Sequence, residues 1–390
     1  MNKDFFKRGI SEIIDQKSFK DKLKSSKKLR IKYGVDPTRP DIHLGHAVAM
    51  RKLKELQNDG HTIIFLIGDY TAKIGDPSGR NFARPVLSDE EIKQNALTYF
   101  DQAGKILDIT KAEIKYNSEW FSKLHFADVL QLMGKFSVAQ IIERDDFAKR
   151  LKSGTNLGMH EILYPLMQAY DSIVLKADIE FGGTDQKFNM LAARELQKKS
   201  GQIPQDIVIV DLLVGLDGKI KMSKSADNYI SITETADSMF GKVMSIPDSL
   251  ILEYFDLATN LSETEINKLK EELKSGANPR DLKLKLASEI VTLYHTKKEA
   301  TEAEKNFIKR FSKKELPKNI PEIVIPEKNC ELLKLVILAD ETLSKSDARR
   351  VIEQSGVKID GTKITDPAAE IGIKKGLVVQ IGKLKIYKVK

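Results

Sequence analysis

The sequence has almost no cysteine and no long apolar run. Cys330 is the one cysteine among 390 residues, so a disulfide within the chain is impossible. No apolar stretch reaches the about 20 residues that a bilayer-spanning helix needs. The N-terminal segment has no apolar signal-peptide core, and repeats and low-complexity tracts are absent. These absences favour a cytoplasmic protein without a membrane partner.

The overall composition is that of a globular protein with a real core. Hydrophobic residues make up 41% and charged residues 31% of the chain. A length of 390 residues predicts two or three domains. The net charge of +8 is compatible with a polyanionic partner, although many proteins without one are equally basic.

The first part of the chain has a β-α-β pattern. Residues 5–29 favour a helix, and residues 29–35 predict a strand. After a proline-containing loop, apolar residues recur at helical spacing over 44–58, and residues 61–68 form a nearly continuous apolar run. The pattern predicts a doubly wound, Rossmann-like α/β domain with a parallel sheet, whose sites lie at the carboxyl ends of its strands.

The rest of the chain predicts two further domains. Helices are expected over 161–176 and 184–200, a last buried strand over 207–215, and mainly helices from 231 to 312. Three prolines between 313 and 328 indicate a linker. Helices over 332–339 and 347–354 follow, and then short strands. The predicted boundaries are a catalytic nucleotide-binding domain at 1–230, a helical domain at 231–312, a linker at 313–329 and a small α+β domain at 330–390.

The segment His43-Leu44-Gly45-His46 lies where the loop meets the first long helix. A helix start exposes free N–H groups and the positive end of the helix dipole, which suits phosphate. Gly45 lets a nucleotide ring lie against the backbone, and the two histidines could donate hydrogen bonds to phosphate oxygens. For this segment alone, surface or capping histidines are the simpler alternative.

Two loops carry further positive charge. Lys221 and Lys224 belong to Lys-Met-Ser-Lys-Ser and could close onto a polyphosphate, or simply form a solvated lysine loop. The turn at 75–80 presents the carboxylate Asp76 and the guanidinium of Arg80, with Arg84 four residues on. Taken alone, it could be an ordinary surface turn.

Together, the two segments at 43–46 and 221–225 resemble the signature motifs of class I aminoacyl-tRNA synthetases. Four more segments are similar to tyrosyl-tRNA synthetases: Asp36-Pro37-Thr38, the turn at 75–80, Tyr164-x-x-x-Gln168-x-x-Asp171, and 182–186. The resemblance is detailed over 30–230 and looser over 231–312. Residues 343–350 and 357–361 resemble an S4-type RNA-binding domain.

The resemblance implies a tyrosine–tRNA ligase. Such an enzyme activates L-tyrosine with ATP, releases pyrophosphate, and transfers tyrosine to the 3′ end of tRNA(Tyr). It implies ATP as a substrate with Mg²⁺, no tightly bound cofactor, no protein-held metal, and a homodimer. We expect the dimer interface around the apolar segment from Leu130 to Met167.

The resemblance also implies residue roles around the nucleotide. Thr38, His43 and His46 would contact ATP. The leaving pyrophosphate would be held by Lys221, Lys224, Arg80 and Arg84. The residues implied around the adenylate are Asp36, Gly183, Asp185 and Gln186.

For the amino acid, the resemblance implies that Asp76, Tyr164 and Gln168 cradle the tyrosine ammonium group, and that Asp171 accepts the phenol proton. In the tail, the charged residues expected to contact RNA are Lys345, Arg349, Arg350 and Lys358.

Two positions depart from the family. Many members have a second phenol-binding tyrosine where this chain has Lys32, while Tyr33 stands next to it and should point to the opposite face of the strand. Glu180 replaces a glutamine that many members place before the glycine pair. Glu180 could be a structural acid with a buried partner or could contact the substrate.

Three other functions fit parts of the sequence. A tryptophanyl enzyme shares both motifs, and indole N–H could also donate to Asp171, but the spacing of Tyr164, Gln168 and Asp171 favours tyrosine. An RNA-binding or splicing role could use the basic tail, although the intact motifs argue against lost catalysis. A cofactor-making nucleotidyltransferase would use the histidine motif but has no need of the lysine motif or the tail.

Overall fold

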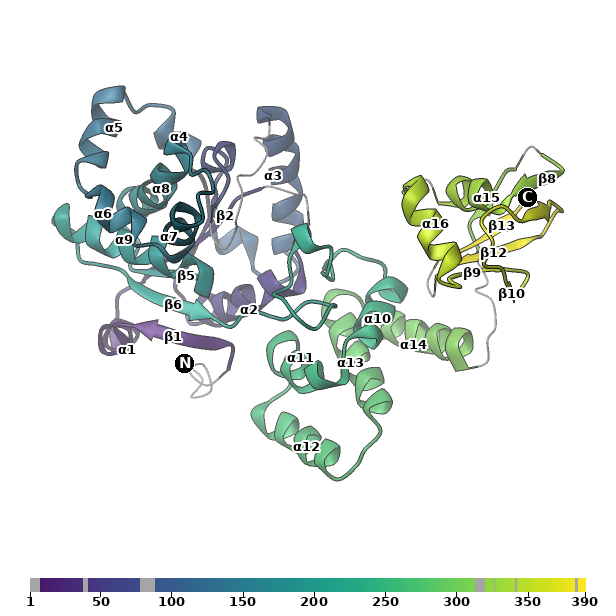
Figure 1. Ribbon diagram of the computed structural model, residues 1–390. Helices are drawn as coiled ribbons and strands as arrows, with labels where there is room; N and C mark the ends of the chain where they lie inside the picture. The colour runs from purple at the N-terminus through teal and green to yellow at the C-terminus, as the bar shows by residue number, and fades with distance from the viewer. Residues whose placement is uncertain are drawn as a thin grey trace. The chain divides into compact units, whose positions relative to one another are not determined.

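The computed structural model describes residues 8–37, 41–77, 88–312, 320–325, 327–340, 342–382 and 385–390. The chain forms two compact units, residues 1–304 and 305–390 (Figure 1). No helix in the described ranges is long and apolar enough to cross a membrane.

The first unit is built on a six-stranded sheet in the order β1-β6-β5-β2-β3-β4. Five strands are parallel, and β1 is antiparallel to β6. The strands are β1 (Ile10–Ile14), β2 (Arg30–Val35), β3 (Thr62–Ile67), β4 (Glu113–Tyr116), β5 (Ile179–Gly183) and β6 (Asp206–Val210). The predicted doubly wound α/β fold is confirmed.

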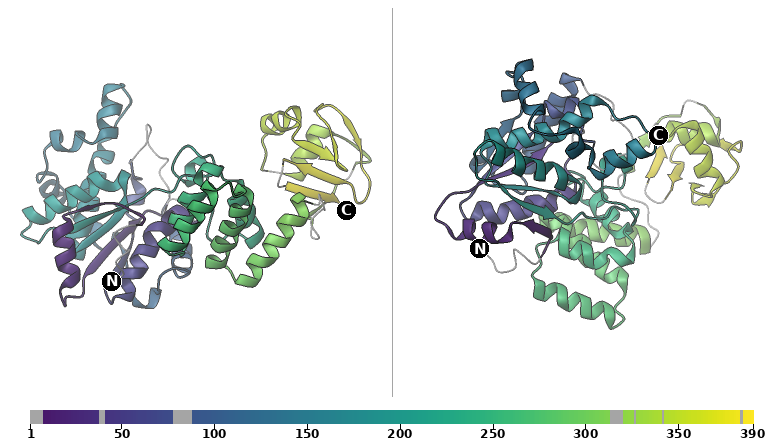
Figure 2. Two further views of the ribbon diagram at one scale, coloured as in Figure 1. Left: turned by 90° about the horizontal axis from the view of Figure 1, so that it is seen from below. Right: turned by 60° about the vertical axis from the view of Figure 1, so that its left-hand side comes forward.

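Helices lie on both faces of this sheet (Figure 2). The helices of this part are α1 (Gln16–Lys24), α2 (Leu44–Asn58), α3 (Asp89–Ala103), α4 (Ser118–Phe121), α5 (Phe126–Met133), α6 (Val138–Ile142), α7 (Asp145–Lys152), α8 (Met159–Leu175) and α9 (Lys187–Lys199). Ile64 and Leu66 of β3 pack with Met167 of α8, while Phe65, which points the other way, packs against Phe100 of α3. The two faces of the sheet therefore meet different helices.

The helix expected over 5–29 is wrong in its first half. Residues 10–14 form β1, and only 16–24 are helical. Gly9 and Asp15 adopt positive φ on either side of β1, and Ile10, Ile13 and Ile14 pair with β6. Pairing with the buried strand β6 therefore overrides the local helical pattern, because the hydrogen bonds of a strand come from its partner strand and not from its own neighbours in sequence.

The helical segment after the sheet belongs to the first compact unit through Glu304. Its helices are α10 (Ala236–Ser245), α11 (Ile251–Ala258), α12 (Glu263–Lys274), α13 (Pro279–Tyr294) and α14 (Lys297–Ser312). Ser262 caps α12 and Glu265 returns the bond in a capping box.

The second unit is a small α+β fold with its own core. Its helices are α15 (Leu332–Ala339) and α16 (Lys345–Glu353). Its five-stranded sheet has the order β10-β9-β12-β13-β7, and β8 pairs with β11. These strands are β7 (Glu322–Ile323), β8 (Asn329–Glu331), β9 (Val357–Ile359), β10 (Thr362–Lys363), β11 (Glu370–Gly372), β12 (Val378–Ile381) and β13 (Lys385–Val389).

The linker expected over 313–329 is shorter than the sequence suggests. β7 lies inside that range and pairs in parallel with β13, and Ile325 is in the core of the second unit. Residues from 320 onward therefore belong structurally to the second unit.

Candidate active site

The described residues that are predicted to contact ATP or tyrosine lie around the carboxyl ends of β2 and β5. These strands are neighbours, and the chain continues from β2 toward β3 but from β5 toward β6 on the other side. The strand order thus reverses between them, which is where open α/β sheets bind ligands. Asp36 follows β2 directly, and Gly183 ends β5.

His43 and His46 begin α2 and face one another. The His43 backbone N–H donates to His46 Nδ1 at 3.3 Å, and the ring centroids are 3.8 Å apart. Burial, together with the positive charge of Lys224 and Lys221, lowers the pKa of His43 to about 3 and holds that of His46 well below its ordinary value. Both imidazoles are therefore neutral at physiological pH and can donate to phosphate without carrying charge.

The lysine segment lies against the start of α2. A Cβ on Gly45 would lie 3.7 Å from Met222 Cβ of the lysine segment, and Leu44 N–H donates to the carbonyl of Ile230, five residues beyond that segment, at 3.0 Å. Lys221 Nζ contacts Asp185 Oδ2 at 2.6 Å. Lys224, which is 8% exposed, donates to Tyr99 Oη at 2.8 Å. The structure thus brings together the two motifs that are some 180 residues apart.

Two glycines of the site have no room for a side chain. A Cβ on Gly45 would lie 3.0 Å from the His43 ring, and one on Gly183 would lie 2.6 Å from Asp185 Oδ1. A side chain at either position would therefore have to displace a neighbouring side chain of the site.

One chain of hydrogen bonds runs from Asp36 toward Asp171. Tyr164 Oη donates to Asp36 Oδ2 at 2.8 Å, and Thr71 Oγ1 donates to Asp36 Oδ1 at 2.9 Å. Asn117 Nδ2 donates to Thr71 Oγ1 at 3.0 Å and approaches Asp171 Oδ2 at 3.5 Å. Asp36, expected near the adenylate, and Tyr164, expected near the amino acid, therefore belong to one network.

Asp171 is a buried carboxyl group on α8, 3% exposed. Trp120 Nε1 donates to its Oδ1 at 2.9 Å. Burial raises its pKa to about 7, against the opposing effects of Lys32, Trp120 and Asn117. An acceptor of this kind suits a phenol hydroxyl, because a buried hydroxyl needs a partner.

A second chain of hydrogen bonds joins Asp76 to Gln168. Gln186 Nε2 donates to Asp76 Oδ2 at 2.6 Å. Asn189 Nδ2 donates to Gln186 Oε1 at 3.1 Å and to Gln168 Oε1 at 2.8 Å. Arg144 NH1 donates to Asn189 Oδ1 at 3.3 Å. Residues assigned to the tyrosine ammonium group thus share one polar network with Gln186.

Both departures from the family are explained by one contact. Lys32 Nζ lies 3.0 Å from Glu180 Oε1, with side-chain exposures of 1% and 2%. Glu180 is therefore a structural acid with a buried partner. Tyr33 packs against Phe65 with ring centroids 6.0 Å apart, on the other face of β2 from α8. It is thus directed away from Asp171, as the alternation of the strand predicts.

Three predicted site residues lie outside the described residues: Thr38, Arg80 and Arg84. Five side chains of the site escaped the sequence analysis because each is a single residue on a different element. Trp120, the only tryptophan in the chain, gave the one usable signal, since a lone buried indole needs an acceptor. The five are Tyr99, Asn117, Trp120, Arg144 and Asn189.

The four cations expected to contact RNA lie in the second unit. α16 begins at Lys345, so Lys345 and Arg349 share one helix face. Lys345, Arg349 and Arg350 are exposed, and Lys358 of β9 is partly exposed. Arg350 also contacts Asp347 at 2.7 Å.

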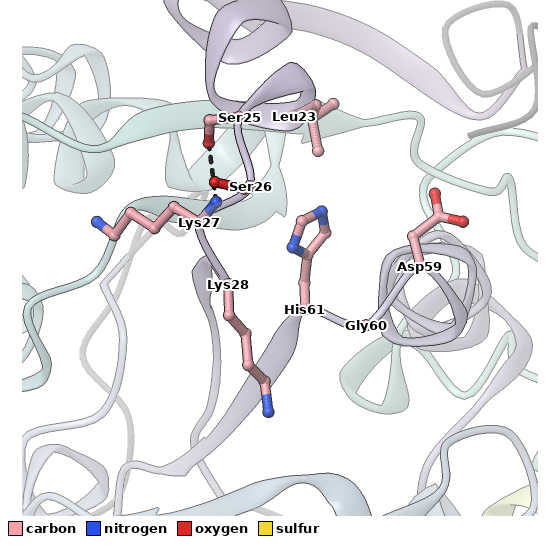
Figure 3. A pocket seen from close by; sticks show the side chains of 8 residues that line it. All are labelled: Leu23, Ser25, Ser26, Lys27, Lys28, Asp59, Gly60 and His61. Atoms are coloured by element: carbon pink, nitrogen blue, oxygen red, sulfur yellow. Dashed lines mark hydrogen bonds between the residues drawn. The ribbon is translucent and has the colours of Figure 1, made fainter.

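A separate cavity of about 430 Å³ opens at the opposite, amino-terminal ends of β2 and β3 (Figure 3). It contains none of the predicted site residues. Lys27, Lys28 and His61 are among the side chains that line it. A second cavity, of about 490 Å³, lies between α2 and α11 and is lined in part by Arg8, Arg51 and Lys105. Both therefore lie apart from the network described above.

Sequence comparison gives a family match and many full-length relatives. The family described as tRNA synthetases class I (W and Y) matches residues 24–312. A protein of Bordetella avium named tyrosine–tRNA ligase is 50% identical over 98% of this chain and 94% of its own length. A protein of the same name from Thermotoga maritima is 46% identical over 98% of this chain and 96% of its own length.

Solved structures give the same fold. A tyrosyl-tRNA synthetase from Archaeoglobus fulgidus, solved with L-tyrosine, has a TM-score of 0.64 and 25% identity and covers 77% of this chain and 98% of its own. A truncated mitochondrial tyrosyl-tRNA synthetase from Aspergillus nidulans has a TM-score of 0.66 at 23% identity, covering 80% of this chain and 95% of its own.

Proposed function

The chain belongs to the class I tRNA synthetases, and within them to the tyrosine–tRNA ligases, and we propose from this premise how its site performs that reaction. L-Tyrosine and ATP form tyrosyl-adenylate and pyrophosphate, and the tyrosyl group then passes to the 3′ end of tRNA(Tyr). The observation that carries the proposal is the meeting of the neutral His43–His46 pair with Lys221 and Lys224. The hydrogen-bonded network from Asp36 toward Asp171 belongs to the same site.

Adenylate formation needs positioning more than proton transfer. The tyrosine carboxylate, already ionised, attacks the α-phosphorus of ATP, and the bond to the bridging oxygen of pyrophosphate breaks. Negative charge grows on the phosphate oxygens during this step, and fixed donors lower the barrier by meeting it. We assign this to His43 and His46 as neutral donors and to Lys221 and Lys224 as cations, with Thr38, Arg80 and Arg84 as further contacts.

The contacts of the two lysines support this assignment. Lys221 is paired with Asp185, and Lys224 contacts Tyr99 Oη. These partners hold both ammonium groups beside the histidines. A polyphosphate can replace Asp185 at Lys221 and approach Lys224 while Tyr99 holds it in place. Asp36, Gly45, Gly183, Asp185 and Gln186 would then border the nucleoside part of the adenylate.

The amino acid is selected at the Asp171 end of the hydrogen-bonded network. Asp76, Tyr164 and Gln168 would receive the ammonium group, and Asp171 would accept the phenol proton. A buried carboxylate facing phenylalanine would lose its partner, which costs much more than a lost methylene contact. Tyrosine is therefore favoured over phenylalanine by the chemistry of the pocket.

ATP brings magnesium with it as a substrate complex. Among the described residues, no group of three or more His, Cys, Asp or Glu side chains could hold a metal ion. The second unit, with Lys345, Arg349, Arg350 and Lys358, would contact tRNA(Tyr) through phosphates, in the cytoplasm where tRNA is charged.

We also propose a homodimer. Large apolar side chains stand exposed on and around α5, including Phe126 at 75% and Leu130 at 51%. Val138, Leu151 and Met159 are exposed nearby in sequence. Several exposed large apolar side chains within one stretch of the chain are typical of an interface. Phe126→Asp should shift the protein toward monomer in sedimentation equilibrium, and an unchanged mass would contradict the interface.

Pyrophosphate exchange into ATP, run with each of the twenty amino acids separately, tests the function. We expect exchange with tyrosine to exceed exchange with every other amino acid. A higher rate with tryptophan would refute the tyrosine assignment, since the tryptophanyl enzymes share both motifs.

A further inference from the structure

A charged pair is buried in the centre of the sheet, directly beneath the tyrosine end of the site. Lys32 of β2 and Glu180 of β5 stand opposite one another in the parallel register. Their side chains are 1% and 2% exposed, and Lys32 Nζ lies 3.0 Å from Glu180 Oε1. Lysine and glutamate are almost never buried this deeply unless they are paired.

All three N–H donors of Lys32 are already used. Besides Glu180, its ammonium group donates to the Gln168 carbonyl at 2.9 Å and to Ser172 Oγ at 2.8 Å. A lysine ammonium group has three donors and no acceptor. Lys32 therefore has no donor left for a substrate phenol and does not substitute for the second tyrosine of other family members.

Glu180 receives the matching set of bonds. Gln168 Nε2 donates to its Oε1 at 3.1 Å, and Ser172 Oγ donates to its Oε2 at 3.2 Å. Gln205 Nε2 also donates to Oε2. The pair is thus hydrogen-bonded to α8 at Gln168 and Ser172, and Asp171 lies between these two positions.

A buried ion pair of this kind adds little to the free energy of unfolding compared with apolar residues of similar volume. Desolvation of two buried charges offsets much of their attraction, and apolar residues of similar volume often serve as well or better. Its position beneath Asp171 and Gln168 gives it another use.

We propose that Lys32 and Glu180 are a positioning pair for tyrosine specificity. In this pair Lys32 supplies the positive charge that favours Asp171 as the acceptor of the phenol hydroxyl, and Glu180 orients Gln168. The proposal rests on the proposed function. It deepens that function by assigning the specificity to a charge that the substrate does not touch.

The electrostatics around Asp171 agree with the geometry. Lys32, from β2, lowers the pKa of Asp171, whereas burial and the carboxylate of Glu180, from β5, raise it. Trp120 and Asn117, from the other side, contribute hydrogen bonds and no charge. Among these groups Lys32 provides the positive charge, so removing it should leave Asp171 protonated at neutral pH.

A double-mutant cycle of Lys32→Gln, Glu180→Gln and the combined variant tests this. Two readouts are followed from pH 5.5 to 9: tyrosine KM in pyrophosphate exchange, and the fluorescence of Trp120 without tyrosine. Trp120 is the only tryptophan in the chain and donates to Asp171, so it reports that carboxyl group directly.

The expected shifts have opposite signs. Lys32→Gln should raise the midpoint of the Asp171 titration, as followed by Trp120 fluorescence, by about one pH unit or more, because a cation is lost. Its tyrosine KM at pH 7 should rise about tenfold and recover at higher pH. Glu180→Gln should lower the midpoint, because an anion is lost, and the double variant should lie between the two single variants.

Arg150→Gln is the matched control. Arg150 and Glu161 form another buried ion pair at the other end of α8, 2.7 Å apart with exposures of 2% and 4%. This variant should melt at a lower temperature and keep the wild-type midpoint. A midpoint that moves in the control, or that moves in the same direction or not at all in the two single variants, overturns the proposal.

The proposed function and the role of the Lys32–Glu180 pair are tested by different measurements. Wild-type protein without tyrosine-dependent exchange would contradict the proposed function, whereas the Trp120 titration needs no activity. Should Lys32→Gln fail to fold, Glu180→Gln alone decides, since its midpoint must fall.

Discussion

Replacing Asp171 with asparagine should raise the stability of the protein and lower its specificity for tyrosine. The side chain keeps its shape, but its charge is removed from a position that is 3% exposed. Because Asp171 is buried and serves the substrate, the wild-type protein should be less stable than the variant and much more selective.

The stability change follows from the raised pKa. Burial raises the pKa of Asp171 from 3.8 to about 7, which corresponds to about 4 kcal/mol against the ionised folded state. Between about pH 4 and pH 7 the folded state holds a proton that the unfolded state releases, so the wild-type free energy of unfolding falls as pH rises through this range. The asparagine of the variant would not titrate. The variant should therefore gain as much as about 4 kcal/mol above pH 7, less about 1 kcal/mol for a weaker bond from Trp120.

Thermal melting of both proteins at pH 4 and pH 8 measures this difference. About 2–4 °C of melting temperature is expected per kcal/mol. The variant should melt at a higher temperature than the wild type at pH 8, and the two melting temperatures should be nearly equal at pH 4. A variant that is no more stable than wild type at pH 8, or an advantage that does not depend on pH, would refute the reasoning.

The same variant should lose its discrimination. A hydrogen bond to a charged group contributes about 1.5–3 kcal/mol, so kcat/KM for tyrosine should fall about 10- to 150-fold, and that for phenylalanine should change little. Tyrosyl enzymes are themselves the reference case for discrimination of about 10⁵ against phenylalanine, so the full ratio comes from the family and not from this structure. A retained preference for tyrosine would show that Asp171 does not bind the hydroxyl.

Three further predictions concern the rest of the molecule. Lys224→Ala and Lys221→Ala should slow exchange, each by about 3–4 kcal/mol in activation free energy, with little change in tyrosine binding; an unchanged rate with raised KM would contradict the assignment. Tyr99→Phe removes the hydroxyl that holds Lys224 and should raise the KM for ATP in exchange assays while leaving tyrosine KM unchanged; equal effects on both would argue against a role for Tyr99 at the phosphates. Ending the chain after Ser312, ahead of β7, should leave exchange nearly intact and greatly reduce tRNA charging, and charging by the full chain should weaken with salt by a slope of roughly −0.7 to −0.9 per phosphate contact; normal charging by the truncated protein would show that the second unit does not bind RNA.

The local sequence determined the elements whose signals are local. The apolar run before Gly68 predicts β3, and Ser88 and Glu91 predict the start of α3, because caps and apolar periodicity depend on neighbours in the chain. The resemblance of the two motifs, in their order, to the signature motifs of class I aminoacyl-tRNA synthetases was enough to predict the class of enzyme. The sequence analysis missed β1 and β7, since the strand that pairs with β1 lies about 195 residues away along the chain and the one that pairs with β7 about 66 residues away.

The tertiary structure decided which side chains meet. Lys32 and Glu180 each look like a misplaced charge in the sequence, and they become a pair only because β2 and β5 lie side by side in register. Trp120 and Asn117 reach Asp171 from elements that the sequence connects to it in no visible way. Hydrogen bonds and ion pairs act over about 3 Å in space and are indifferent to separation along the chain, so the environment of a buried carboxyl group is fixed only when the sheet and its helices have assembled.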